Sequence, residues 1–482
     1  MAIATDENID LTHLKRGIGP LQATALNVTM VVGAGVFATI PLMLGKLPGP
    51  YALLAWIVAG VLIYFDGMIW SELGAALPGS GGSYRYLLIS YGSQRWGRLM
   101  AFLFIWQFMI SGPLELGSGL IAIALFSSSL SPAFQKFNED HTLRSVLWKS
   151  QDVAISIGPS RLLAFAFGLL IIFLLFRNIT TLGKLTITFW IGVMGAIAWI
   201  IFEGLIRFDP SRAFSFTGPA AQLPQNFMGN LGLAMILAIY SYLGYYNVCY
   251  IGDEVRDPAK TIPKSIIASV LIVSILFVLV HLSLLGTVPW QQISVTETNL
   301  PAEFMRRIHG PWAASAITIL LVWCCFGSVF AGMLGYSRIP YGAARDGHFF
   351  SSLTKVHSIK QVPHVSLFLI GTFTLIWGFF DLDNIIKALI TTRILEQFVC
   401  QIIGVFLLRK NQPNLERPYR IWLYPIPCLI ALIGWLWIYV ASGWLFIGLG
   451  AGTMAVGAAV FLIWSMRTGR WPFERPIHTD SL

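Results

Sequence analysis

Long apolar runs alternate with short polar segments along almost the whole chain. A helix needs about 20 mainly apolar residues to cross the hydrocarbon core of a bilayer. On that basis the pattern predicts about twelve transmembrane helices, near residues 21–44, 50–76, 97–129, 161–177, 183–206, 229–252, 264–288, 311–340, 364–380, 384–408, 419–441 and 443–466. The predicted fold class is therefore an all-α membrane protein.

The order of these helices predicts an internal repeat. The first five span residues 21–206 and the next five span 229–408, which are nearly equal lengths. Because five is odd, the second set must enter the membrane from the opposite side, as in inverted-repeat transporters. Two further helices, within 419–466, lie outside this 5+5 repeat. The tails are residues 1–20 and 467–482.

The first and sixth runs are interrupted by glycine and polar residues in mid-membrane. The first contains VVGAGVF at 31–37, and the sixth reads YSYLGYYN at 240–247. Free backbone groups are costly in lipid and are tolerated where they line a cavity. Interrupted helices at corresponding positions of two repeats predict a substrate site and a secondary transporter.

The two breaks offer complementary chemistry. A break at Gly33-Ala34-Gly35 leaves free N–H groups and a positive helix end, which suit a carboxylate. A break between Tyr240 and Gly244 leaves free carbonyls, which suit an ammonium group or a sodium ion. Together they fit a zwitterionic amino acid. Two simpler interpretations remain open: a small-residue packing face in the first helix, and tyrosines that hydrogen-bond within the bundle in the sixth.

Composition and charge agree with a membrane protein. The 482 residues are 56% hydrophobic and only 11% charged, and the mean hydropathy is +0.71; soluble proteins carry roughly 25% charged residues. The net charge of +9 does not indicate nucleic acid, because the basic residues gather in alternate loops. Loops and helix ends on the side of the amino terminus hold 21 lysines and arginines, against 10 on the other side. This asymmetry predicts cytoplasmic termini, in a plasma or inner membrane.

Several protein classes lack their sequence signs. The chain has no HExxH, GxSxG or P-loop motif, so neither an enzyme nor an ATP-driven pump is predicted. The five cysteines lie in or against apolar runs without CxxC spacing, which argues against disulfides and a zinc site. A sensor that binds amino acids without moving them remains an alternative, although the tails are short for a signalling appendage.

Six motifs in order resemble those of the amino acid–polyamine–organocation (APC) transporters. They are VGAGVF at 32–37, GSGGSY at 79–84, YSYLGY at 240–245, DEVRDPAKTIP at 253–263, SRIPYGAARDG at 337–347, and RPYR with YPIP within 417–427. Because they extend from the first helix to the eleventh, the resemblance covers nearly the whole chain.

The resemblance implies secondary active transport of amino acids by alternating access, with the substrate held between unwound helices 1 and 6. The implied substrate-binding residues are Val32, Gly33, Ala34, Gly35, Tyr240, Ser241, Leu243, Gly244 and Tyr245. The amides of residues 34 and 35 would receive the carboxylate, and the carbonyls of residues 240, 241 and 243 the amine. Tyr245 would be a gate or a wall for the substrate side chain.

The resemblance leaves the coupling ion open. Relatives that use protons or exchange substrates often carry a lysine partway along helix 5, but no lysine follows Lys184 in that run. No cofactor is expected. We expect a proton as the coupling ion rather than sodium, for which Ser328 is the one candidate ligand.

Charged residues inside the membrane are candidates for function. Glu115 and Glu396 are candidate proton relays or specificity residues, and they make a cationic amino acid or polyamine the main alternative substrate. Arg393 and Glu396 are three residues apart, so we expect them to form a structural ion pair. Asp66 is a further candidate, and His281 is expected to be a satisfied interior histidine.

Two expectations concern the regions outside the membrane. Asp253 and Glu254, after the sixth helix, are expected to form a solvated gate or a helix cap. The longest external segment, Ser131–Ser160, has no cysteine. A partner chain linked through a disulfide in that loop is therefore not expected.

Overall fold

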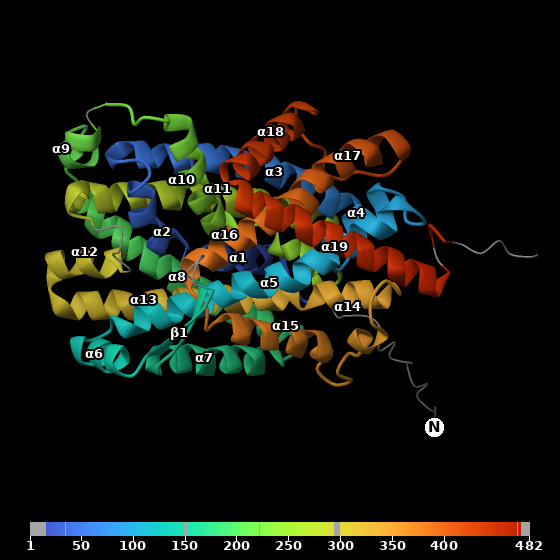
Figure 1. The fold of residues 1–482 in the computed structure, drawn as a ribbon, viewed down its shortest axis with the longest axis horizontal. Helices are drawn as coiled ribbons and strands as arrows, with labels where there is room; N and C mark the ends of the chain where they lie inside the picture. The colour runs from blue at the N-terminus through green and yellow to red at the C-terminus, as the bar shows by residue number, and fades with distance from the viewer. Residues whose placement is uncertain are drawn as a thin grey trace, which may run out of the picture.

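The computed structural model describes residues 16–33, 35–148, 153–220, 222–293, 299–469 and 471–473. Within these ranges the chain is almost entirely helical, and the long helices lie side by side (Figure 1). The α-helices of the first half are α1 (Pro20–Val31), α2 (Gly35–Leu44), α3 (Ala52–Ala76), α4 (Ser83–Ser90), α5 (Trp96–Ser128), α6 (Pro132–Asp140), α7 (Pro159–Leu175), α8 (Ile179–Ile206) and α9 (Pro210–Ala213). Those of the second half are α10 (Phe227–Tyr242), α11 (Pro258–Thr287), α12 (Leu300–His309), α13 (Pro311–Tyr336), α14 (Arg338–Arg345), α15 (His364–Trp377), α16 (Leu382–Arg393), α17 (Cys400–Asn411), α18 (Ile426–Ala441) and α19 (Trp444–Thr468).

Eight helical segments of the described residues are long and apolar enough to cross a membrane. They are Pro20–Leu44, Gly49–Ala76, Trp96–Ser128, Ile179–Ile206, Pro258–Thr287, Pro311–Arg345, Ala388–Asn411 and Ile447–Arg467. Four shorter apolar helices, α7, α10, α15 and α18, lie at other predicted spans. The predicted all-helical membrane fold is confirmed, whereas the count of twelve and the repeat stay predictions.

Two predicted spans differ from the structure for local reasons. The eleventh helix begins at Ile426 rather than near 419, because the proline-containing stretch before it does not continue a helix. The tenth span is not a continuous α-helix. It is α16, then a π-helical segment (η8, Ile394–Val399), then α17, and π segments of this kind are frequent at functional sites.

The segment between α5 and α7 carries the one sheet of the described residues. Strands β1 (Leu143–Trp148) and β2 (Val153–Ile157) pair antiparallel, with Leu143 opposite Ile157. The helix α6 precedes them in the chain, and the hairpin reaches the turn after α15, where the amide of Ser156 donates to the Phe379 carbonyl (2.9 Å). Composition alone gave no structure for this loop.

The core is one large apolar cluster that the long helices share. Helix α11 packs along α3, and α13 packs along α5. The facing ends of α1 and α10 are buried among these helices, over residues 25–31 and 238–242. The two breaks therefore lie inside the bundle.

Candidate functional site

The first predicted helix is broken where the glycines fall. Helix α1 ends at Val31, and α2 begins at Gly35. Between them the amide of Gly33 donates to the Val31 carbonyl (2.9 Å). Ala34 lies outside the described residues. The N–H groups in the first turn of α2 have no partner within their own helix, as at every helix start.

The sixth predicted helix is also interrupted. Helix α10 ends at Tyr242, and the chain resumes as a 3₁₀ turn, η4 (Asn247–Tyr250). Gly244 has φ = +109°, a conformation that favours glycine. The Tyr240 carbonyl accepts from the amide of Leu243 (3.3 Å), but within the described residues the carbonyls of Ser241 and Leu243 accept no backbone hydrogen bond.

The glycines at the two breaks let the backbones touch. A Cβ on Gly35 would lie 2.7 Å from the Ser241 Cα, and one on Gly244 would lie 2.6 Å from the Met30 Cγ. A Cβ on Gly33 would lie 2.6 Å from the Oγ of Ser328, on α13. The same glycines therefore allow both close helix packing and a break in the helix. The packing interpretation and the binding-site interpretation of these glycines are compatible.

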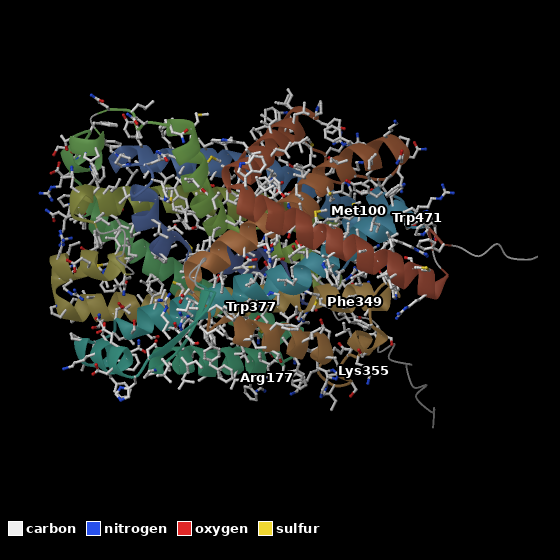
Figure 2. The ribbon with its side chains drawn as sticks, in the orientation of Figure 1. Met100, Arg177, Phe349, Lys355, Trp377 and Trp471 are labelled. Atoms are coloured by element: carbon white, nitrogen blue, oxygen red, sulfur yellow. The ribbon has the colours of Figure 1, made fainter. Side chains whose placement is uncertain are left out.

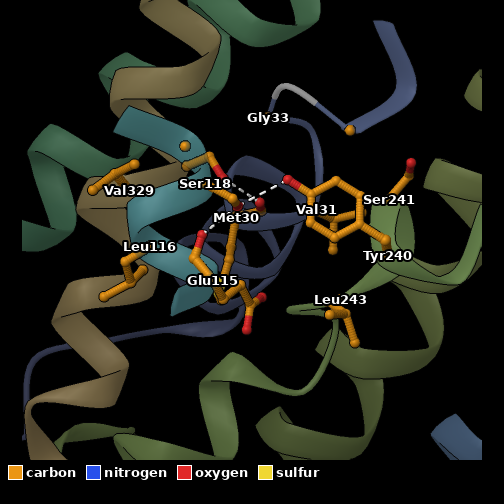
Figure 3. Close-up of a pocket in the computed structure, with 13 residues that line it drawn as sticks. Met30, Val31, Gly33, Glu115, Leu116, Ser118, Tyr240, Ser241, Leu243 and Val329 are labelled. Carbon is orange, nitrogen blue, oxygen red and sulfur yellow. Dashed lines mark hydrogen bonds between the residues drawn. The ribbon is translucent and has the colours of Figure 1, made fainter. Parts of the chain in front are cut away.

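A cavity of about 40 Å³ lies where the two breaks meet α5 and α13 (Figure 3). This volume has room for water molecules but not for a larger ligand. Its lining residues are Met30, Val31, Gly33, Gly35, Glu115, Leu116, Ser118, Gly119, Tyr240, Ser241, Leu243, Ser328 and Val329. Residues at the start of α2 and at the end of α10 therefore line one cavity.

Hydroxyl groups crosslink the helices around this cavity. The Tyr240 hydroxyl donates to Ser118 Oγ (2.8 Å), which donates to the Glu115 carbonyl (2.6 Å), as Figure 3 shows. The Ser328 hydroxyl donates to the Met30 carbonyl (2.6 Å) at the end of α1. Thus α10 is tied to α5, and α1 to α13, at the cavity.

The structure brings together most of the predicted binding residues. Those that line the cavity are Gly33, Gly35, Tyr240, Ser241, Leu243, Glu115 and Ser328, whereas Val32, Gly244, Tyr245 and Glu396 do not. The Tyr245 hydroxyl instead donates to Asp66, on α3. From α5 and α13 the sequence analysis named Glu115 and Ser328, and it missed the other lining residues of these helices, which are Leu116, Ser118, Gly119 and Val329.

The predicted ion pair between Arg393 and Glu396 is wrong. Arg393 pairs with Glu115, and its Nε also donates to Ser111 Oγ (3.2 Å). The Tyr336 hydroxyl donates to the same Glu115 carboxylate. The π segment begins just after Arg393. A π-helical turn is wider than an α-helical turn, so Glu396 is rotated away from Arg393. The predicted pair had assumed α-helical spacing between these two residues.

The other buried polar residues have mixed surroundings. His281 accepts a hydrogen bond at Nδ1 from Trp56 Nε1 (2.8 Å), but its Nε2 is buried without a partner among the described residues. Asp66 accepts from Trp435 Nε1 (2.9 Å) as well as from Tyr245. Glu396 is buried, and its Oε2 has no partner within the described chain.

Asp253 and Glu254 are ion-paired rather than freely solvated, so that part of the expectation is wrong. Glu254 is buried and accepts from Arg338 Nε (2.8 Å); Asp253 accepts from Arg345 Nη1 (2.8 Å). Burial alone would raise the pKa of Asp253, but the charge of Arg345 and its hydrogen bond outweigh burial and hold that pKa below its usual value. These pairs attach the segment after η4 to α14.

The fold and the cavity define a class: a multi-pass integral membrane protein with a central site between two interrupted helices. A family model described as amino acid permease matches residues 18–465. The chain therefore belongs to the amino acid permease family, as the six motifs predicted. This is a family of transporters and not of enzymes.

Relatives along most of the chain carry transporter names. The chain is 26% identical to a human cystine/glutamate transporter over 424 residues, which cover 87% of this chain and 79% of the relative. It is 25% identical to the branched-chain amino acid permease BcaP of Bacillus subtilis over 468 residues, 94% of each protein. It is also 25% identical to the serine/threonine exchanger SteT of Bacillus subtilis, over 87% of this chain and 90% of that one.

Proposed function

We propose that this protein is a secondary transporter that moves amino acids across the membrane by alternating access. The observation that carries the proposal is the meeting of opposite polar groups in one cavity. Gly35 brings the amides at the start of α2 to it, and Ser241 and Leu243 bring carbonyls at the end of α10 that accept no backbone hydrogen bond among the described residues. A carboxylate fits the first set and an ammonium group the second. The names of the relatives support this substrate class.

The cavity favours a neutral amino acid over the cationic alternative. Its one acidic side chain, Glu115, is neutralised by Arg393 and accepts a hydrogen bond from Tyr336. Glu396, the second acid on which the cationic alternative depended, does not line the cavity. The remaining side-chain walls are apolar or carry hydroxyls, which suits a small or apolar substrate side chain.

The size of the site supports alternating access. A cavity of about 40 Å³ is too small for an amino acid, so the substrate enters only when the walls separate. The two breaks are the natural moving points, because each leaves half a helix free to turn about a glycine. We further propose the twelve-helix, 5+5 inverted arrangement, both termini in the cytoplasm, and a proton as coupling ion.

Transport into proteoliposomes that hold the purified protein tests the proposal. A panel of neutral amino acids, cationic amino acids and polyamines would be run in three conditions: a proton gradient, a sodium gradient, or unlabelled substrate inside only. We expect saturable uptake of neutral amino acids. Binding without movement would instead favour the sensor, and selective uptake of arginine or polyamines would favour the cationic alternative. Neither binding nor movement across the panel would refute the amino acid assignment.

A matched variant tests the site itself. Gly35→Leu puts a large side chain against Ser241, so we expect it to abolish transport while the protein still folds and inserts. Normal transport by this variant would overturn the binding-site assignment.

A further inference from the structure

A second cavity lies at the turn from α7 to α8, close to the segment that leads into α1. It occupies about 370 Å³ between the turn from α7 to α8 and the loop that joins α14 to α15. Figure 2 shows Arg177 of the turn and Lys355 of this loop. The lining residues are Leu174, Arg177, Asn178, Thr181, Leu185 and Lys360. None of them lines the central cavity.

Two cations of this cavity are held in place by aromatic rings. The Lys360 Nζ lies 4.3 Å from the centroid of the Phe176 ring, and the Arg177 Cζ lies 5.3 Å from that of Phe173. Such contacts orient a cation without neutralising it. Among the described residues neither side chain forms an ion pair, and no acidic side chain lines the cavity. Two uncompensated positive charges therefore adjoin one cavity.

The start of α8 adds hydrogen-bond donors of the same sign. Asn178 caps this 28-residue helix: its Oδ1 accepts from the amide of Thr181 (2.9 Å), which leaves the side-chain NH₂ free to donate outward. The Thr181 hydroxyl is a further donor, and the helix end carries partial positive charge. Several donors and two cations around one space suit an anion with several acceptor oxygens, such as a phosphate group.

The apolar part of the lining indicates where this anion comes from. Leu174 and Leu185 belong to the lining, and the neighbouring Phe173 on α7 is 60% exposed. A ligand with a phosphate head and an apolar tail satisfies both parts. Basic pockets between membrane helices on the cytoplasmic side are suited to anionic lipid headgroups.

We propose that this cavity is a binding site for a phosphate-bearing anion, and that its occupant is the headgroup of an anionic phospholipid in the adjoining leaflet. Free phosphate has the same chemistry and is the soluble alternative. The site adjoins a working part of the molecule. A Cβ on Gly17, in the segment that leads into α1, would lie 2.9 Å from the Ile179 Cγ2 at the start of α8. The start of α8, which borders the cavity, therefore lies against the segment that leads into the first interrupted helix.

The test measures thermal unfolding of the purified full-length protein in detergent. Dioctanoyl phosphatidylglycerol, dioctanoyl phosphatidylcholine and sodium phosphate would be titrated separately. A ligand that binds only the folded state raises the unfolding temperature as its concentration rises. We expect phosphatidylglycerol to raise it and phosphatidylcholine not to. A rise with sodium phosphate at the same concentrations would assign the site to the free ion.

Paired variants locate the effect. Because hydrogen bonds to charged groups contribute more than neutral ones, Arg177→Gln/Lys360→Gln should weaken phosphatidylglycerol binding by at least about tenfold. Arg256→Gln/Lys264→Gln removes the same charge from exposed positions on the same side and should bind as the wild type does. Lys360→Arg keeps the positive charge and should retain binding. It serves as the second test if the double variant folds poorly. Equal binding by the two double variants, or no response to any anion, would overturn the proposal.

Discussion

A close backbone approach between the two interrupted helices gives a sharp prediction. Gly35, the first residue of α2, lies against Ser241 of α10. In Gly35→Ala the new Cβ would lie 2.7 Å from the Ser241 Cα and 2.9 Å from its Cβ. Because the nearest atom belongs to the backbone, no change of rotamer relieves the contact. The two helices must move apart at the cavity.

The size of the effect follows from packing. Inserting a methyl group into a close-packed interior costs about 1–3 kcal/mol. This corresponds to a factor of roughly 5 to 150 in the population of the closed conformation or in substrate affinity. Gly195, inside α8, is a matched control because a Cβ there would meet nothing within 4 Å. Gly195→Ala should stabilise the protein by about 0.5–1 kcal/mol, since alanine favours a helix over glycine.

Substrate counterflow into proteoliposomes measures the effect, with thermal unfolding as the control for folding. We expect Gly35→Ala to lower the initial rate at least tenfold, and Gly195→Ala to keep it within about twofold. The double variant Gly35→Ala/Ser241→Gly should recover part of the loss, since contacting residues couple by about 0.5–3 kcal/mol. A wild-type rate in Gly35→Ala, or additive losses in the double variant, would refute the inferred contact.

Three further predictions concern charge and polar burial. Glu115→Gln leaves Arg393 buried without its counter-ion, so we expect thermal unfolding to show about 3–5 kcal/mol of destabilisation. An unchanged melting temperature would contradict the ion pair between Glu115 and Arg393. Arg345 lowers the pKa of Asp253, so the ionised carboxylate stabilises the folded protein fully above about pH 4, and this stabilisation is lost as the pH falls through the lowered pKa. Asp253→Asn should therefore remove this loss of stability at acid pH from a pH series of unfolding temperatures. A variant whose series matches that of the wild type would contradict the prediction. Neither amide atom of Gln107 has a partner among the described residues, so Gln107→Leu should be neutral or stabilising, and a loss above about 1 kcal/mol would indicate an unrecognised hydrogen bond.

Several elements could be predicted because their causes are local. The apolar runs gave most helix positions within a few residues, since the length of a spanning helix is set by the bilayer. The breaks at Gly33 and Gly244 were also predictable, because glycine and polar residues in mid-membrane mark backbone that does not continue as a helix. The late start at Ile426 was not predicted, since hydropathy alone does not show where a proline-containing stretch stops being helical.

The lining of the central cavity was only partly predictable. The lining residues at the two breaks could be predicted from the motifs. Ser118 and Val329 could not, because no local sequence pattern shows which face of α5 or α13 turns toward the cavity. Tyr245 illustrates the limit. It directly follows Gly244, yet its hydroxyl reaches Asp66 on α3 instead of the cavity. The direction of a side chain after a break depends on the irregular backbone, and periodicity no longer applies there.

The sequence by itself determined the membrane-spanning character, the family and the two points at which helices are interrupted, because hydrophobicity, motifs and glycine act through neighbouring residues. Only the tertiary structure decided which buried groups are partners. Arg393 pairs with Glu115, 278 positions away in the chain, and not with Glu396 three positions on. A buried charge takes the partner whose geometry removes most of its desolvation cost, and that geometry exists only once α5, α13 and α16 have packed together.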